Sequence, residues 1–286
     1  KIYDIIQLMK SFRLKHTILT IFLVTTILYG IVLFFVVRAT VITNGMDAAH
    51  VLGQSNFTGS SGGTTSTTLG SPTSVAIDTT NNRTFVADPL NNRVLVYNTA
   101  TITDGEADVN VLGQANFTSS AMGTTQSGMI APKGVAYDAD SDRLFVSDTG
   151  NHRILVFNVA SITDGENAIS VLGQANFTSG TANRGGSVAV NSLSSPSGIE
   201  HDSCDGHSGA CILASSPTDD IIFVSDTSNH RVLVFNVASI TDGEDAILVI
   251  GQANFTSGSA NRGGSTAANS FSSPTDSSFN PTSLEL

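Results

Sequence analysis

The residues of this chain that could do chemistry recur in one pattern, Asp-x-x-Asn-x-Arg, at three places. The three copies are Asp88, Asn91 and Arg93, then Asp148, Asn151 and Arg153, then Asp226, Asn229 and Arg231. Catalytic groups are normally placed once per site, so a set that recurs in every unit indicates a structural role. We predict that each Asp ends a strand and accepts backbone N–H groups of the next turn, and that each Asn is a left-handed turn residue. Each Arg is expected to reach back to the carboxylate as a fork.

Histidines occupy equivalent positions in two of these turns. They are His152 and His230, and Asn92 takes the same position in the first copy. A metal site needs three or four convergent ligands. We therefore expect exposed turn histidines and predict no metal ligands here.

Two acidic patterns could bind calcium. Asp138-Ala-Asp-Ser-Asp142 has the opening rhythm of a calcium loop, but Arg143 stands where such a loop has Gly and Thr149 where it has Glu. We predict a hairpin turn there. Asp-Gly-Glu, beginning at 104, 164 and 242, is also predicted to be a turn, with a weak surface calcium site as the alternative. No other cofactor is predicted.

The two cysteines, Cys204 and Cys211, lie in a single insertion. In an oxidising compartment a loop of this size favours a local disulfide. The alternative is a metal held by both cysteines and His207, but that spacing matches no common zinc pattern. We predict the disulfide.

A long internal repeat must position all of these residues. The octapeptide Val-Leu-Gly-Gln-x-Asn-Phe-Thr begins at 51, 111 and 171 and returns as Val-Ile-Gly-Gln-Ala-Asn-Phe-Thr at 249, so the period is 60 residues and later 78. In the second unit we expect strands at 134–138, 143–148, 153–158 and 168–173, paired antiparallel. The third strand is an unbroken apolar run, which requires cover on both faces and favours sheets packed between neighbouring sheets.

The repeated residues resemble those of a known family. Pro72-Thr-Ser-Val-Ala-Ile-Asp78, Pro132-Lys-Gly-Val-Ala-Tyr-Asp138 and Pro196-Ser-Gly-Ile199, each followed by Phe-Val-x-Asp-x-x-Asn-x-Arg, are similar to NHL repeats. This resemblance implies an all-β fold, a β-propeller of four-stranded antiparallel blades. We expect a partial blade at 46–70, blades at 71–130, 131–194 and 195–273, and the start of another at 274–286. Closed propellers need about four to eight blades, so we expect a fragment of a longer protein or a subunit that closes with another chain.

The N-terminal region carries the strongest local signal. Residues 17–37 form a run of 21 residues without a charge, long enough to cross a bilayer as a helix. A cleaved signal peptide is the alternative, but its apolar core is shorter and a small-x-small cleavage site follows it. Basic residues concentrate before the run, so residues 1–16 are predicted to be cytoplasmic, 38–45 a linker, and 46–286 an extracytoplasmic domain of a single-pass membrane protein.

Charge limits the partners. From residue 39 onward the chain has 23 acidic and 8 basic side chains, a net charge of −15, which argues against nucleic acid. We predict a recognition or scaffold module without catalytic residues, whose partner is a protein, a peptide or a glycan. The candidate face includes the turns at Asn91, Asn151, His152, Asn229 and His230. The alternatives are a metal-dependent propeller enzyme of the lyase or lactonase type and a surface protein that self-associates through open blade edges.

Overall fold

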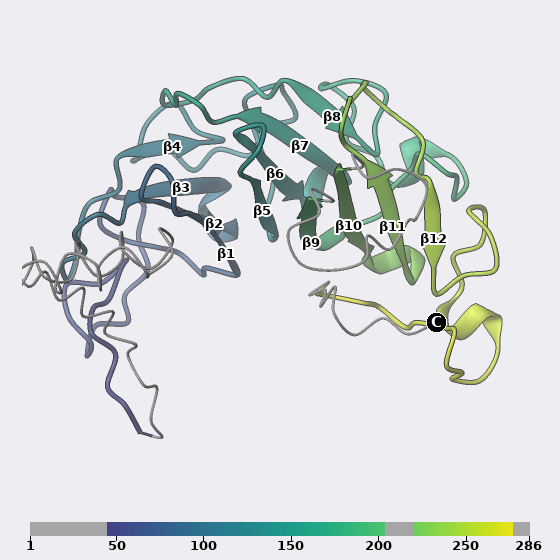
Figure 1. Cartoon of the computed structure of the whole chain (residues 1–286), viewed down its shortest axis with the longest axis horizontal. Helices are drawn as coiled ribbons and strands as arrows, with labels where there is room; N and C mark the ends of the chain where they lie inside the picture. The colour runs from purple at the N-terminus through teal and green to yellow at the C-terminus, as the bar shows by residue number, and fades with distance from the viewer. Residues whose placement is uncertain (1–44, 204–219, 277–286) are drawn as a thin grey trace, which may run out of the picture. The chain divides into compact units, whose positions relative to one another are not determined.

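Three separate four-stranded antiparallel sheets make up the described part of the chain. The structure is a computed structural model, and it describes residues 45–203 and 220–276. In each sheet the strands are hydrogen-bonded in the order in which they follow one another in the sequence (Figure 1). The first sheet contains β1 (Ser74–Asp78), β2 (Arg83–Asp88), β3 (Arg93–Asn98) and β4 (Asn110–Leu112). The second contains β5 (Val135–Asp138), β6 (Arg143–Asp148), β7 (Arg153–Asn158) and β8 (Ser170–Leu172). The third contains β9 (Pro196–Ser203), β10 (Asp220–Asp226), β11 (Arg231–Asn236) and β12 (Leu248–Ile250).

The apolar runs become the central strands of their sheets, as their patterning predicts. In β3, β7 and β11 the first five residues are buried, without the alternation of a strand that has one wet face. The prediction of four antiparallel strands per unit is confirmed. The fourth strand is shorter than expected, because β8 forms only over Ser170–Leu172.

Side chains from neighbouring sheets share two hydrophobic cores. Phe85 and Val94 of the first sheet pack in one cluster with Leu155 and Phe157 of the second. A second cluster joins the second and third sheets through residues at equivalent positions. The first strands of the sheets also approach one another, β1 beside β5 and β5 beside β9. This face-to-face packing is that of propeller blades, although the described sheets do not close a ring.

A short 3-10 helix links the second and third strands of each sheet. These helices are Pro89–Asn91, Thr149–Asn151 and Thr227–Asn229, and two further ones are Ala182–Gly185 and Ala260–Gly263. The residue after each linking helix is left-handed, with φ of 52° at Asn92 and 54° at His152 and His230. The prediction that Asn91, Asn151 and Asn229 take this conformation was wrong by one position, because those residues lie inside the helix.

Several predictions concern residues that the structure does not describe. They are the membrane span at 17–37, the N-terminal segment before it, and the disulfide between Cys204 and Cys211. Within residues 45–203 and 220–276, no helix has the length and apolar character needed to traverse a bilayer. The domain limits proposed from the sequence remain predictions.

Candidate functional site

The Asp-x-x-Asn-x-Arg residues form a buried hydrogen-bonded network in each sheet. In the second sheet, Asp148 and Arg153 are fully buried, and Arg153 Nε lies 2.7 Å from Asp148 Oδ2. The same oxygen accepts a bond of 2.8 Å from the Asn151 amide, while Oδ1 accepts the backbone N–H of Ile130 at 2.7 Å. Asp148 therefore ties its own turn to the connection that precedes the sheet. The prediction that it accepts backbone N–H groups of the turn was wrong, because the backbone donor is Ile130 and the turn donates through the Asn151 side chain.

The arginine makes one bond to the carboxylate instead of a fork. Its other nitrogens donate to backbone carbonyls of the connections that flank the sheet, at Thr125 (2.9 Å), Gly128 (2.8 Å) and Phe177. Arg93 and Arg231 make equivalent bonds in the first and third sheets. One buried guanidinium thus holds two loops that lie apart in the sequence, which is a structural function.

The residues proposed for a binding face are largely engaged inside the protein. Asn91, Asn151 and Asn229 are buried and donate to the neighbouring aspartate. His152 and His230 are half-buried, and each Nδ1 accepts a backbone N–H of the following connection, from Ser195 and Ser273, both at 2.9 Å. The expectation of exposed turn histidines was wrong for this reason. The binding role of this face stays a prediction.

Asn92 performs the task of these histidines in the first sheet. Its Oδ1 accepts the N–H of Ala131 at 2.8 Å. A nitrogen that accepts a hydrogen bond cannot carry a proton. The neutral rings of His152 and His230 therefore carry their N–H at Nε2. Burial lowers the pKa of His152, an effect that nearby Asp226 opposes. These positions therefore link consecutive sheets.

The Asp-Gly-Glu turns also link consecutive sheets. Asp164 Oδ1 accepts the N–H of Val111 at 3.1 Å, and the N–H of Gly165 donates to the Val111 carbonyl at 3.0 Å. Glu166 accepts an N–H within its own turn. In the same way, Asp104 accepts the N–H of Val51 and Asp242 accepts that of Val171. Each turn thus clamps the outermost segment of the preceding unit, which accounts for the motif without calcium.

The predicted hairpin at Asp138 is confirmed by the antiparallel pairing of β5 with β6. Asp138 Oδ1 accepts the backbone N–H groups of Asp140 (3.0 Å) and Ser141 (3.2 Å), and Oδ2 pairs with Arg143 at 2.7 Å. Burial opposes the charge of Asp138, but the bond from Arg143 and the proximity of His201 outweigh it and hold its pKa below the usual range. The acidic residues of segment 138–142 therefore form a hairpin turn.

One buried polar pair breaks the equivalence of the sheets. Tyr97 and Asp108 occupy the positions of Phe157 and Ala168 in the second sheet. Within the described residues the Tyr97 hydroxyl and both Asp108 oxygens have no hydrogen-bond partner. Burial raises the pKa of Asp108 to about 7, against the attraction of Arg93. Burial, and then the charge of Asp108, raises the pKa of Tyr97.

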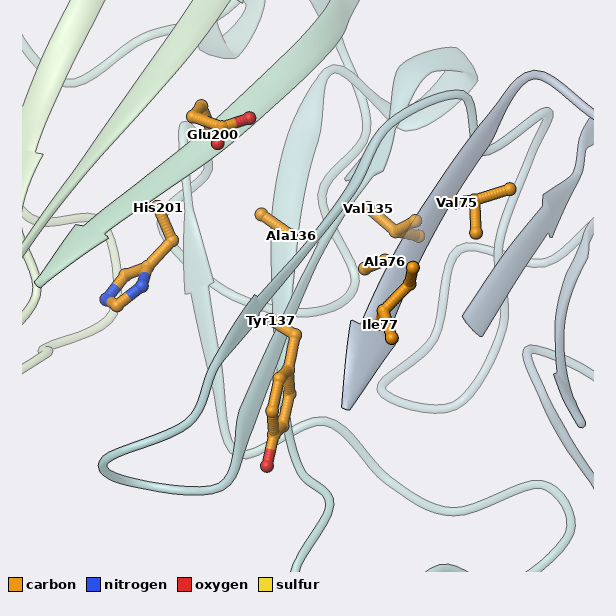
Figure 2. Close-up of a pocket in the computed structure, with 8 residues that line it drawn as sticks. All are labelled: Val75, Ala76, Ile77, Val135, Ala136, Tyr137, Glu200 and His201. Carbon is orange, nitrogen blue, oxygen red and sulfur yellow. The ribbon is translucent and has the colours of Figure 1, made fainter. Parts of the chain in front are cut away.

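A pocket of about 320 Å³ lies along the first strands of the three sheets (Figure 2). Its lining residues are Val75, Ala76 and Ile77 of β1, Val135, Ala136 and Tyr137 of β5, and Glu200 and His201 of β9. Val75 and Ile77 are 57% and 62% exposed, so the pocket has apolar surface that a partner can reach. This pocket combines accessible apolar surface with polar groups from β5 and β9, so it is the better candidate site.

Glu200 supplies the carboxylate of the pocket. Burial raises its pKa, and the negative charges of Asp276 and Asp202 raise it further. Tyr137 donates its hydroxyl to Asp142 at 2.8 Å and is stacked on Phe85. Glu200 is therefore the lining residue best suited to attract a positive charge.

Sequence reasoning missed Glu200 and His201, although a signal was present. Aligned on their prolines, the three units carry Ala76, Ala136 and Glu200 at one position and Ile77, Tyr137 and His201 at the next. The third unit therefore departs from the other two at both positions.

Comparisons with known proteins identify part of the repeat. No curated protein matches the chain significantly. Similar solved structures include hydrazine synthase of Kuenenia stuttgartiensis, 12% identical with a TM-score of 0.38, covering 65% of this chain and 37% of that one. They also include U3-55K, at 12% and 0.39 with coverage of 63% and 39%. An auxiliary nutrient binding protein from Bacteroides ovatus is 13% identical at 0.41, with coverage of 73% and 43%. The chain thus spans about two fifths of the length of these structures. Residues 131–157, which include the second Asp-x-x-Asn-x-Arg set, match the family model of the NHL repeat.

Proposed function

We propose that this protein is a recognition module that binds a protein or peptide segment in the pocket formed by β1, β5 and β9. NHL-repeat folds generally serve as protein-interaction or scaffold modules. The observation that carries the proposal is that one pocket is lined by Glu200 on β9 and by the exposed side chains of Val75 and Ile77 on β1, with β5 between them (Figure 2). Such a surface suits a side chain with an apolar stem and a positive end, which describes lysine and arginine.

Electrostatics favours a cationic partner. Glu200 is half-buried and has Asp202 and Asp276 as negative neighbours, so a positive group would relieve their mutual repulsion. The acidic composition of the chain acts in the same direction at longer range, because it attracts positive partners during encounter. Binding should therefore weaken as salt rises.

The test uses an array of immobilised peptides that vary in lysine, arginine and leucine content, probed with the full chain. Glu200→Ala restores the residue of the other two sheets, and Ile77→Ser removes exposed apolar surface. Ile169→Ser is the matched control, since Ile169 is a 51% exposed isoleucine next to the outermost strand β8. We expect Glu200→Ala and Ile77→Ser to weaken binding of basic peptides about tenfold, and Ile169→Ser to leave it unchanged. Equal binding by all variants, or preference for acidic peptides, would refute the proposal.

We also propose that residues 17–37 anchor the module in a membrane with the repeats outside the cytoplasm. The support is the length of the uncharged run and the basic residues before it. In intact cells, an added protease should remove the repeats, and alkaline extraction should leave the chain in the membrane. Release by alkali would reject the anchor, and protection from protease would reject the orientation.

A further inference from the structure

Three side chains with metal-ligating atoms converge where the second and third sheets meet. They are Asp138 at the end of β5, His201 in β9 and Asp220 at the start of β10, and their ligand atoms all lie within 4.8 Å of one another. None of the patterns singled out in the sequence contains this set. The topology assembles it, because the first strand of each sheet lies beside that of the next.

The histidine has a free nitrogen directed at this cluster. Its side chain is only 7% exposed, and Nε2 lies 3.9 Å from Asp138 Oδ1, beyond hydrogen-bond range. Nε2 is buried and has no partner among the residues that the structure describes. The ring is stacked on Phe145 with centroids 5.9 Å apart, which fixes its orientation. A buried nitrogen without a partner is destabilising because it has lost its hydrogen bonds to water, so an occupant would relieve an existing penalty.

The equivalent junction between the first and second sheets provides an internal comparison. There Tyr137 takes the place of His201, is stacked on Phe85, and donates its hydroxyl to Asp142. Asp142 corresponds to Asp220, and Asp78 to Asp138. The tyrosine therefore satisfies its junction without an added group. The junction of the second and third sheets has the two equivalent carboxylates. Its His201 Nε2, however, makes no hydrogen bond to them or to any other described residue.

We propose that Asp138, His201 and Asp220 bind a divalent transition-metal ion such as Zn²⁺, which ties the second sheet to the third. Imidazole and carboxylate are preferred ligands of Zn²⁺, and three protein ligands leave a position for water. Zinc–ligand bonds are about 2.0–2.2 Å long, so the side chains need to move together by only about 1 Å. His201 also lines the pocket, but the metal site does not require a peptide to be bound there.

Among the residues that the structure describes, Arg143 is the one positive side chain at the cluster, and it does not exclude a cation. Its Nη2 lies 2.7 Å from Asp138 Oδ2 and 3.5 Å from Asp220 Oδ2. Two carboxylates and one guanidinium leave a net charge of −1 around a neutral imidazole. The metal takes Asp138 Oδ1, the oxygen that lies nearer His201 and also accepts the backbone N–H groups of Asp140 and Ser141, while Oδ2 keeps its bond to Arg143.

The test titrates Zn²⁺ into the full chain after treatment with a chelator, and measures stoichiometry by calorimetry and stability by thermal unfolding. His201→Tyr recreates the junction of the first two sheets and should remove one zinc site per chain. Tyr137→His is the reciprocal change and should add one, using Asp78 and Asp142. Both variants retain every other histidine and cysteine, so binding elsewhere cancels in the comparison.

Substitution of the carboxylates provides a second, matched pair. Asp220→Asn should weaken the site about tenfold or more, whereas Asp142→Asn should not. Circular dichroism without metal shows whether each variant is folded. Equal stoichiometry in the wild type and a folded His201→Tyr variant would overturn the proposal. So would a stabilisation by Zn²⁺ that persists in both His201→Tyr and Asp220→Asn.

Discussion

Asp108 should destabilise the folded chain at neutral and alkaline pH, and its replacement by alanine should stabilise it. The side chain is 6% exposed, and neither oxygen has a hydrogen-bond donor among the described residues. The corresponding positions in the other sheets hold Ala168 and Ala246, which are 1% and 5% exposed. Alanine is thus compatible with this position in two sheets of the same design.

The size of the effect follows from the pKa of Asp108. It is raised to about 7 in the folded chain by burial, whereas an unfolded chain has the ordinary value of about 3.9. Between these values the folded state binds the proton and the unfolded state does not, so the free energy of unfolding falls as pH rises from about 4 to about 7. A difference of about 3 in pKa corresponds to about 4 kcal/mol.

Urea denaturation of the full chain at pH 4.5 and pH 8 measures this effect. Asp108→Ala should gain up to about 4 kcal/mol over the wild type at pH 8 and much less at pH 4.5. Asp108→Asn, which cannot ionise, should lose the same pH dependence. Tyr97→Phe removes the neighbouring hydroxyl but leaves the carboxyl, so it should retain that dependence. A difference between Asp108→Ala and the wild type that is the same at both pH values would refute the reasoning.

Two further substitutions test the contacts within and between the sheets. Arg153→Met leaves the Asp148 carboxylate and three carbonyls without their buried donor. In urea denaturation the free energy of unfolding should fall by about 3–5 kcal/mol. A fall below about 1 kcal/mol would contradict a structural role for the guanidinium. His152→Asn copies Asn92, which bonds the following connection in the same backbone conformation. Because the pKa of His152 is lowered in the folded state, the wild type loses stability as pH falls through and below about 6.5, and thermal unfolding from pH 8 to pH 5 should show a smaller loss in the variant.

The sequence was sufficient for the sheets because each strand carries its own pattern. The unbroken apolar run at Ile154-Leu-Val-Phe157 required cover on two faces, and β7 has that cover. The turn before it was harder, since the pattern predicted the left-handed conformation at Asn151 and the structure has it at His152. The amide of Asn151 is needed inside the helix for Asp148, so the strained conformation passes to His152.

The candidate sites depended on contacts between units, which a pattern along the chain does not contain. Asp164 was predicted to lie in a turn, but its partner Val111 is 53 residues away. The pocket likewise takes its lining from three strands that only the packing of the sheets brings together. Glu200 and His201 were visible in the alignment as departures from the repeat, but their meaning depended on knowing which strand faces which.

The Asp-Gly-Glu clamp also bears on how such a chain can evolve. Each unit carries both partners of the contact, a valine whose N–H donates and an acidic turn whose aspartate accepts. A copy of one unit can therefore make the same contact with the unit before it. A duplicated stretch of the gene would therefore arrive already compatible with its neighbours. The 30 identical positions of 35 between residues 146–180 and 224–258 fit growth of the domain by duplication. The array can then lengthen by unequal crossing-over between repeated gene segments, without a new interface between units.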